Sequence, residues 1–208
     1  MNFYVMETLG SFSYATFDKE EPYNLADLAE RCPKCGKTMG SFLIWMPPRR
    51  AILEKKKIGD FIYGSPSGFL ISKRVIEAYN KENLSGLVIY PEQVEIIKIG
   101  KTKNPNPLQP EYYFARPIES MTMLDAEASG LVMEKVECEY CRRGNTVKYD
   151  HIVIDESTWT GHDIFCPRGG GVVVASQRFI DMVERYKLTN FLYKPAYEDS
   201  WDSRLRRV

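Results

Sequence analysis

Histidine is scarce in this sequence of 208 residues, which contains only His151 and His162. No group of residues along the chain assembles an acid, a base and an oxyanion site. We therefore expect a protein that is not an enzyme. An excess of charge is lacking too, because 28 Lys and Arg balance 28 Asp and Glu. This neutrality disfavours general binding to nucleic acid or to membrane surfaces, which requires a field of one sign.

Long apolar runs are also missing. No uncharged apolar segment approaches the roughly 20 residues that a membrane-spanning helix needs. Residues 1–7 do not show the basic region and apolar core of a secretory signal peptide. We therefore expect a cytoplasmic protein with no membrane partner. The hydrophobic share of 44% and charged share of 27% are ordinary for a folded soluble domain.

Four of the five cysteines form two C-x-x-C pairs, at Cys32 and Cys35 and at Cys138 and Cys141. Two residues between thiolates allow the chain to curl so that both sulfurs meet one tetrahedral ion. Gly36 follows the first pair directly and permits the positive φ that such a turn needs. Two such pairs supply the four soft ligands of a closed structural zinc site, and we predict that these four cysteines bind Zn²⁺.

Other interpretations of the cysteine pairs remain open. One C-x-x-C could act as a thioredoxin-like redox pair, or the cysteines could pack in the interior without a metal. Catalytic zinc is disfavoured, because it needs an open coordination position that a set of four cysteines does not leave. The pairs are also about a hundred residues apart, whereas a common zinc ribbon separates them by about 15–20.

The chain contains an internal repeat, because residues 72–91 align without gaps with residues 176–195. The identical pairs are Ser72 and Ser176, Arg74 and Arg178, Ile76 and Ile180, Leu84 and Leu188, and Pro91 and Pro195. Chance likeness between two amphipathic helices is the alternative. The match extends beyond the helix through the following strand and its proline, which favours a true repeat.

Each copy of the repeat predicts a β–α–β unit. Strands are expected over residues 68–71 and 171–175, and each leads to a serine, Ser72 or Ser176, suited to cap a helix. Each helix has one apolar stripe, and second strands are expected over 87–90 and 191–194. The apolar residues of the two stripes are Val75, Ile76 and Tyr79 in one copy and Phe179, Ile180 and Val183 in the other.

These observations predict an α+β fold with two related β–α–β-containing halves, joined by a four-cysteine zinc-knuckle or ribbon site. The halves are residues 1–100 and 111–197, with a Pro/Asn-rich connector at 101–110 and a frayed tail at 198–208, and they form one compact unit. Further strands are expected at 2–7, 11–17 and 147–154, and a short helix near 25–31.

Three further motifs suggest a function less strongly. Cys166 lies four residues after His162, which resembles a Cys/His nucleophile, but a free cysteine is more often a small buried hydrophobe. The glycines at 169–171 lack the Lys-Ser/Thr of a phosphate loop and predict a turn. The basic run from Arg49 to Lys57 follows Trp45 and could bind RNA or DNA, although such a run is usually a solvated face.

The two cysteine pairs and the segment Ala175-Ser-Gln-Arg-Phe-Ile-Asp-Met-Val183 resemble the double-CxxCG family of bacterial proteins. Members of that family are immunity proteins of contact-dependent swarming toxin systems. The resemblance implies a protein that binds and neutralises a cognate toxin, without an active site of its own. The alternative from the residues alone is a zinc-ribbon protein that binds nucleic acid through the basic run.

Overall fold

The computed structural model describes residues 1–7, 13–21, 24–26, 30–39, 44–65, 68–134, 137–142, 146–169 and 171–202. Its main sheet has the order β16 (Tyr193–Pro195), β1 (Phe3–Met6), β15 (Val174–Ser176), β14 (Ile164–Arg168), β11 (Tyr112–Met123), β7 (Gly68–Ser72) and β6 (Phe61–Ser65). β8 (Leu87–Gln93) also pairs with β11. β11 and β14 are parallel, and the other neighbours in this sheet are antiparallel.

The strands outside the main sheet form three smaller sheets. The largest is ordered β10 (Thr102–Lys103), β9 (Glu95–Ile99), β5 (Arg50–Leu53) and β2 (Phe17–Lys19). The other two are the pairs β3 (Leu25–Ala26) with β4 (Ile44–Trp45) and β12 (Val132–Met133) with β13 (Thr146–Lys148). The described residues also include two short 3₁₀ helices, η1 (Glu156–Thr158) and η2 (Ala196–Glu198).

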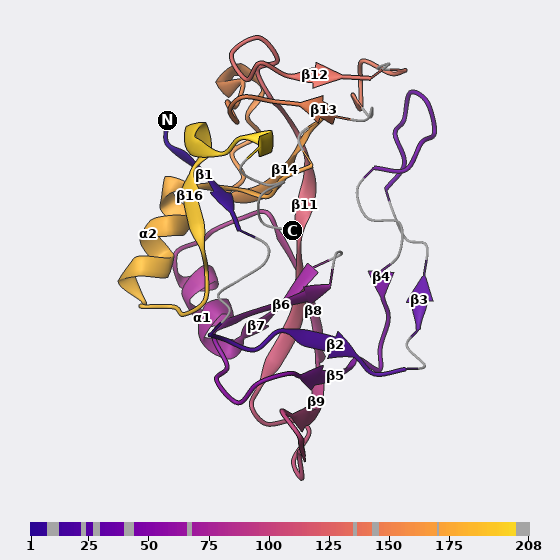
Figure 1. The fold of residues 1–208 in the computed structure, drawn as a ribbon, viewed down its shortest axis with the longest axis vertical. Coiled ribbons are helices and arrows are strands. Elements are labelled where there is room, and N and C mark those ends of the chain that lie inside the picture. The colour runs from indigo at the N-terminus through magenta and orange to yellow at the C-terminus, as the bar shows by residue number, and fades with distance from the viewer. Residues whose placement is uncertain are drawn as a thin grey trace.

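The helices α1 (Lys73–Lys81) and α2 (Gln177–Arg185) lie side by side on one face of the main sheet (Figure 1). They share one hydrophobic core, to which α1 contributes Val75 and Tyr79 and α2 contributes Phe179 and Val183. Both predicted apolar stripes therefore face the sheet. Neither helix is long and apolar enough to cross a bilayer, and the same holds for every helix in the described part of the chain.

The opposite face of the sheet is covered by two other layers, because successive side chains of a strand point to opposite faces. On β7, Ile71 packs under the helices, while Leu70 packs with the four-stranded sheet and Trp45. On β15, Ala175 faces the helices, while Val174 packs against the segment around Tyr149. The molecule thus has three cores on the two faces of one sheet.

The first β–α–β segment is fastened at the start of its helix by the carboxylate of Asp60, whose side chain is 6% exposed. It accepts hydrogen bonds from Ser72 Oγ at 2.7 Å and from the Arg74 guanidinium at 3.0 Å. It also accepts one at 2.9 Å from the backbone N–H of Thr189, which follows α2. Asp60 therefore connects the start of one helix to the chain that leaves the other.

The second segment repeats this arrangement with Asp163, whose side chain is 1% exposed. Ser176 Oγ donates to it at 3.0 Å, Arg178 at 3.2 Å, and the backbone N–H of Ser85 at 3.0 Å. Ser85 follows α1, so the connection runs in the opposite direction. The residues that the repeat pairs in sequence thus make equivalent contacts, and each segment is tied to the other.

The two arginines extend this reciprocity to the ends of the helices. Arg74 donates through Nη2 to the carbonyl of Tyr186, the C-terminal cap of α2, at 3.1 Å. Arg178 donates in the same way to the carbonyl of Glu82, the cap of α1, also at 3.1 Å. Carbonyls at a helix end have no partner within the helix, so each guanidinium satisfies an acceptor of the neighbouring segment.

The structure agrees with several predicted elements of the repeat. Ser72 and Ser176 occupy the N-cap positions of the two helices, but only the side chain of Ser176 accepts a capping hydrogen bond, because Ser72 Oγ donates to Asp60 instead. Leu84 and Leu188 are buried just after the helices. β1, β7 and β8 lie where strands were expected, and glycine 169 ends β14 in a turn. The division of the whole chain into two related halves stays a prediction, since β1 inserts between two strands of the C-terminal half.

Other sequence predictions were wrong. Leu25 and Ala26, expected in a helix, form strand β3, while residues 27–29 lie outside the described part of the chain. The strand expected over 147–154 is confined to Thr146–Lys148 with a bridge at Ile154. The strand expected over 11–17 begins only at Phe17, and residues 8–12 are not described.

The connector and the tail also differ from expectation. Thr102 and Lys103 of the connector form strand β10 and add to the four-stranded sheet. In the tail, Asp199 is buried and accepts a hydrogen bond at 2.8 Å from the hydroxyl of Tyr149, whose ring packs against Trp201. A buried polar contact and an aromatic pair thus hold residues that their polarity suggested would fray, while 203–208 lie outside the described residues.

We predict that Asp163→Asn lowers the free energy of unfolding by about 2–3 kcal/mol, because an amide leaves charged and backbone donors without an acceptor in a buried site. Asp181→Asn is the matched control, since its carboxylate is on the surface of α2 and accepts from Gln177. Surface changes of that kind stay within about 0.5 kcal/mol. Urea denaturation followed by circular dichroism measures both, and equal losses would contradict the role given to Asp163.

Candidate metal centre

The first cysteine pair lies in a tight loop closed by backbone hydrogen bonds. The N–H of Gly36 donates to the carbonyl of Cys32 at 2.8 Å, and the N–H of Cys32 donates to the carbonyl of Lys37 at 2.8 Å. Arg31 and Thr38 pair on either side of the loop. Gly36 has a φ of +70°, as its place after Cys35 predicts. The loop therefore holds both sulfurs on one side.

The second pair forms a similar loop between β12 and β13. The N–H of Arg142 donates to the carbonyl of Cys138 at 2.8 Å. Arg142 takes the position that Gly36 has in the first loop, directly after the second cysteine, and its φ is +46°. A non-glycine residue therefore adopts the left-handed conformation here.

The two loops meet, and all four sulfurs lie within 4.8 Å of one another. Cys32 Sγ is 4.0 Å from Cys138 Sγ, and Cys35 Sγ is 3.8 Å from Cys141 Sγ. Sulfurs of a disulfide are about 2.05 Å apart, and the five cysteines are free. Figure 1 shows how this is achieved, since the loop beyond β3 and β4 reaches toward the ends of β12 and β13.

This sulfur arrangement fits one tetrahedral metal ion. With metal–sulfur bonds of about 2.3 Å, the ligands of a tetrahedron are about 3.8 Å apart, which matches the Cys32–Cys138 and Cys35–Cys141 sulfur separations. Four thiolates fill such a coordination sphere and leave no place for water or substrate. The cluster is therefore suited to hold an ion for structural purposes.

The electrostatics of the cluster also favour a bound cation. Burial opposes ionisation of Cys32, but hydrogen bonds from the backbone at Cys35 and Lys34 outweigh it and lower its pKa to about 7. For Cys35 the backbone N–H of Lys37 favours the thiolate, yet burial and the three neighbouring sulfurs raise its pKa to about 11. A cation among the sulfurs would favour the thiolate at every one of them.

Two contacts outside the ligand set hold the loops in place. Lys37 of the first loop forms an ion pair with Glu137, the residue before Cys138. Arg168, the last residue of β14, donates a hydrogen bond to the carbonyl of Tyr140 and stacks on its ring at 4.3 Å. Tyr140 lies between the two cysteines of the second loop, so the main sheet fixes that loop directly.

Sequence reasoning found the four cysteines but missed these supporting residues. Glu137 directly precedes the second cysteine pair, and Tyr140 lies within it. This proximity to the cysteines is the only signal in the sequence that could have identified them. Arg168 is 27 residues from the nearest cysteine of the cluster, Cys141. No spacing rule connects them, because the contact depends on the path of β14.

Cys166 and His162 do not form a reactive pair in this structure. Cys166 is on β14 opposite Glu119. Burial, and to a lesser extent the carboxylate of Glu119, raises the pKa of its thiol well above the ordinary value, so the thiol stays protonated at neutral pH. Asp163, next to His162, is already engaged by Ser176, Arg178 and Ser85. Cys166 therefore has the setting of a structural cysteine.

The basic run from Arg49 to Lys57 divides between the interior and the surface. Arg49 is only 2% exposed, donates to the carbonyl of Trp45 at 2.7 Å and lies over the ring of Tyr90 at 4.5 Å. Arg50 forms ion pairs with Glu20 and Glu95. Both arginines are thus used by the fold, and the run is not a continuous basic stripe.

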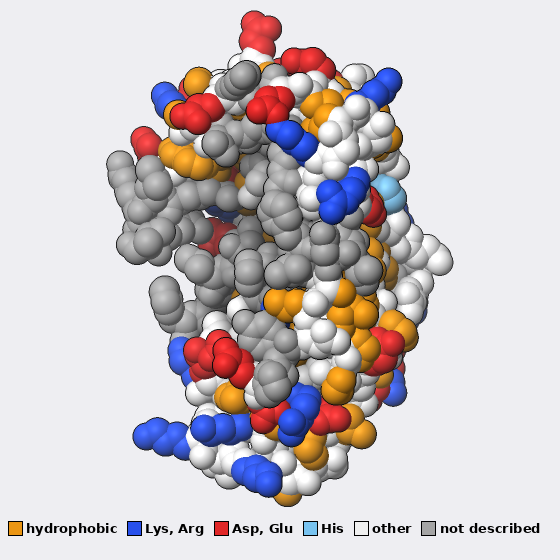
Figure 2. Space-filling model, turned by 90° about the vertical axis from the view of Figure 1, so that its right-hand side faces the viewer, with side chains coloured by type: hydrophobic (Ala, Val, Ile, Leu, Met, Phe, Trp, Pro, Cys, Tyr) orange, Lys and Arg blue, Asp and Glu red, His pale blue; other side chains and the backbone are white. Residues whose placement is uncertain are grey.

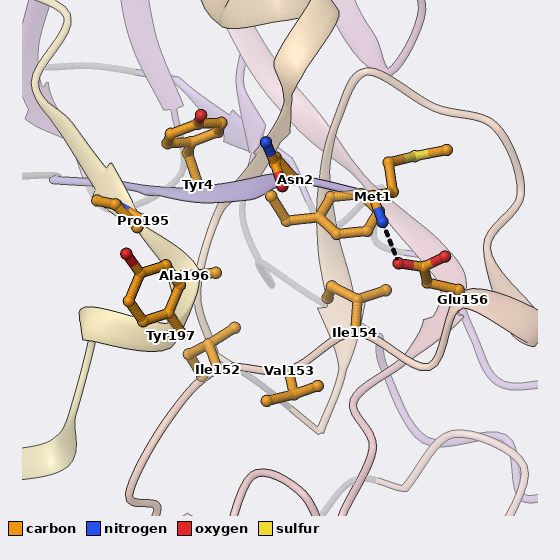
Figure 3. Close-up of a pocket in the computed structure, with 11 residues that line it drawn as sticks. Met1, Asn2, Tyr4, Ile152, Val153, Ile154, Glu156, Pro195, Ala196 and Tyr197 are labelled. Atoms are coloured by element: carbon orange, nitrogen blue, oxygen red, sulfur yellow. Dashed lines mark hydrogen bonds and ion pairs between the residues drawn. The ribbon is translucent and has the colours of Figure 1, made fainter.

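A cavity of about 360 Å³ lies beside β1 and η2 (Figure 3). Its lining is mainly apolar and includes Ile152, Ile154 and Ala196. The two charged groups at its rim, the amino group of Met1 and the carboxylate of Glu156, pair with each other at 2.6 Å. The other titratable residues of its lining are Tyr4 and Tyr197. Because no cysteine or histidine among the described residues lines this cavity, the metal centre is the better candidate site.

Comparison with models of known protein families and with curated proteins finds no match to this chain. The interpretation of the site therefore depends on its geometry and chemistry.

We predict that the protein binds one equivalent of a thiophilic divalent cation through this cluster. Replacing Cys35 or Cys141 with Ser removes a soft ligand and should abolish stoichiometric binding, whereas Cys166→Ser should leave it at one equivalent. Co²⁺ is the probe, because thiolate-to-metal charge-transfer absorption reports sulfur coordination directly. Unchanged absorption in the Cys35→Ser variant would exclude a four-sulfur site.

Proposed function

We propose that Cys32, Cys35, Cys138 and Cys141 hold one structural Zn²⁺, and that the resulting rigid body binds and neutralises a cognate bacterial toxin. The observation that carries the first part is the convergence of four sulfurs from two loops more than a hundred residues apart in sequence. The second part depends on the resemblance of the two cysteine pairs and the segment 175–183 to the double-CxxCG immunity proteins.

Zinc is the ion that this donor set suits best. A tetrahedral set of four sulfurs is typical of zinc or of iron–sulfur clusters. A multi-iron cluster places several atoms between its cysteine sulfurs, whereas here the sulfurs lie within 4.8 Å of one another, as the ligands of one ion do. Calcium and magnesium prefer oxygen ligands, so the sulfur set disfavours both.

The free energy of zinc binding exceeds the cost of joining the distant loops. Closing a loop of about a hundred residues costs about 1.5–2 kcal/mol more than closing the 15–20 residues of a common zinc ribbon. Binding of structural zinc contributes about 10–16 kcal/mol in apparent terms at neutral pH. We infer that zinc fastens the loop beyond β3 and β4 to the loop between β12 and β13.

A binding function suits the described residues better than catalysis does. Four cysteines close the metal centre to substrate, Cys166 is held as a protonated thiol, and Asp60 and Asp163 are both engaged as acceptors of structural hydrogen bonds. An inhibitor of a toxin needs a rigid surface of about 1,200–2,000 Å² buried in total, with a few anchoring side chains. Reciprocal ties between the two helical segments supply such rigidity.

The rival proposal is a zinc-ribbon protein that binds nucleic acid through the basic run. It requires the run to act as one exposed stripe. However, Arg49 is buried, and Arg50 forms ion pairs with Glu20 and Glu95. The exposed basic residues of the run are Arg50, which pairs with those two carboxylates, and the lysines at positions 55–57. We therefore prefer toxin neutralisation as the function.

We predict that removal of zinc with a strong chelator lowers the melting temperature of the protein by at least about 10 °C. Each kcal/mol shifts the melting temperature of a chain of this size by about 2–4 °C, and zinc contributes several kcal/mol through preferential binding to the folded state. Differential scanning fluorimetry with and without added Zn²⁺ measures the shift. A melting temperature unaffected by chelation, in a sample shown to lose its metal, would contradict a structural role.

We predict that the protein rescues growth of a heterologous bacterium that expresses the toxic product of the adjacent gene, and that the two proteins co-purify in a one-to-one ratio. The Cys35→Ser variant should rescue poorly, because the loop that zinc fastens would be released, while Cys166→Ser should rescue fully. Survival curves and the stoichiometry of the purified complex are the two measurements. If the product of the adjacent gene is not toxic and does not co-purify with this protein, the proposal of toxin neutralisation is contradicted. The proposal of a structural zinc ion is not affected by that result.

A further inference from the structure

Six exposed lysines gather at one end of the molecule, although they come from two separate segments. Lys55, Lys56 and Lys57 follow β5, while Lys98, Lys101 and Lys103 belong to the β9–β10 hairpin. β5 and β9 are parallel neighbours, so their carboxyl ends, from which both segments continue, lie at the same end of the four-stranded sheet. We call these six residues the lysine tip. Figure 2 shows basic side chains projecting from this lower end of the molecule.

Contacts between the two segments hold the lysine tip together. The backbone N–H of Gly100 donates to the carbonyl of Leu53 at 2.8 Å, which fastens the hairpin turn to the start of the lysine loop. A Cβ placed on Gly100 would lie 3.8 Å from Cγ of Lys56, so the side chain of Lys56 runs alongside the turn. The tip is therefore one surface, although the sequence separates its segments by about 40 residues.

Four of the six lysines of the tip have no carboxylate partner among the described residues. Lys98 and Lys103 are direct partners across the β9–β10 ladder, and like charges at such positions destabilise a sheet. Within the described residues, Lys56, Lys98, Lys101 and Lys103 form no ion pair. Between residues 98 and 110 the sequence has three lysines and no Asp or Glu. An anionic ligand would relieve this repulsion.

We propose that the lysine tip binds the phosphate backbone of nucleic acid without sequence preference. Duplex DNA presents one negative charge per about 1.7 Å of its axis, which matches a compact group of lysines. Protein–protein interfaces are depleted in lysine, so an acidic protein face fits less well. The ring of Tyr14 is covered by the ammonium of Lys57 at 4.2 Å, so it is not free to stack on a base.

This activity goes beyond toxin neutralisation and does not depend on the metal. The lysine tip and the two cysteine loops lie at opposite ends of the long axis of the molecule in Figure 1. Sequence reasoning disfavoured a nucleic-acid partner because the net charge is zero. In the fold the basic surface has a different composition from the basic run of the sequence. Arg49 is buried and Arg50 is ion-paired, while three lysines of the β9–β10 hairpin lie beside the lysines at 55–57.

The test is fluorescence anisotropy of a labelled 20-base-pair DNA duplex of mixed sequence, titrated with the zinc-loaded protein at 50–200 mM KCl. Each lysine–phosphate contact contributes about 0.9 to the slope of log K against log salt, so four to six contacts predict a slope of about −3.6 to −5.4. The triple variant Lys98→Gln, Lys101→Gln, Lys103→Gln should reduce the magnitude of that slope by about 2.7.

A second triple variant, Lys73→Gln, Lys148→Gln, Lys187→Gln, is the matched control, because it changes the net charge equally at exposed positions away from the tip. It should retain the wild-type slope. The single variant Lys56→Gln tests the other segment and should reduce the magnitude of the slope by about 0.9. Circular dichroism melts confirm that every variant is folded.

Three results would overturn the proposal. The first is no binding of the duplex at 50 mM KCl. The second is an equal loss of affinity in the two triple variants, which would indicate a general charge effect. The third is displacement of the duplex by poly-L-glutamate at the same charge concentration as by unlabelled duplex, which would assign the lysine tip to acidic polypeptides. None of these results bears on zinc binding or toxin neutralisation.

Discussion

The fold depends on two buried carboxylates that must be satisfied from both helical segments at once. Asp60 and Asp163 each accept from a serine at the start of one helix and from the backbone beyond the other helix. A buried charge without partners is costly. If either segment moved away, the buried aspartate of the other segment would lose a hydrogen-bond donor. This reciprocity fixes the two helices side by side on one face of the main sheet and leaves the opposite face to the smaller layers.

The metal centre and the lysine tip both depend on that frame, though in different ways. Arg168 at the end of β14 positions the second cysteine loop through Tyr140, and zinc would in turn fasten the first loop to it. The lysine tip instead depends on the parallel pairing of β5 and β9, which places the loops that follow these two strands at the same end of the sheet. A soft-donor site and a basic surface thus occupy opposite ends of one rigid body (Figure 1).

Local patterns predicted the two helices well because both helices obey rules that act over a few residues. Ser72 and Ser176 stand at the first positions of helices whose apolar stripes face the sheet. The same reasoning failed at Leu25, where pairing with Trp45 imposes a strand, and at Asp199, which Tyr149 holds in the interior. In both places a partner distant in sequence outweighs local propensity.

The sequence by itself determined the donor chemistry of the candidate metal site, since two C-x-x-C pairs specify soft donors and a turn geometry wherever they lie in a chain. It also determined the equivalent helices of the repeat. Only the tertiary structure decided that the pairs meet across more than a hundred residues, that Arg49 belongs to the interior, and that lysines from two segments form one surface. These outcomes depend on which strands become neighbours, and strand pairing is a long-range choice that local residue patterns do not encode.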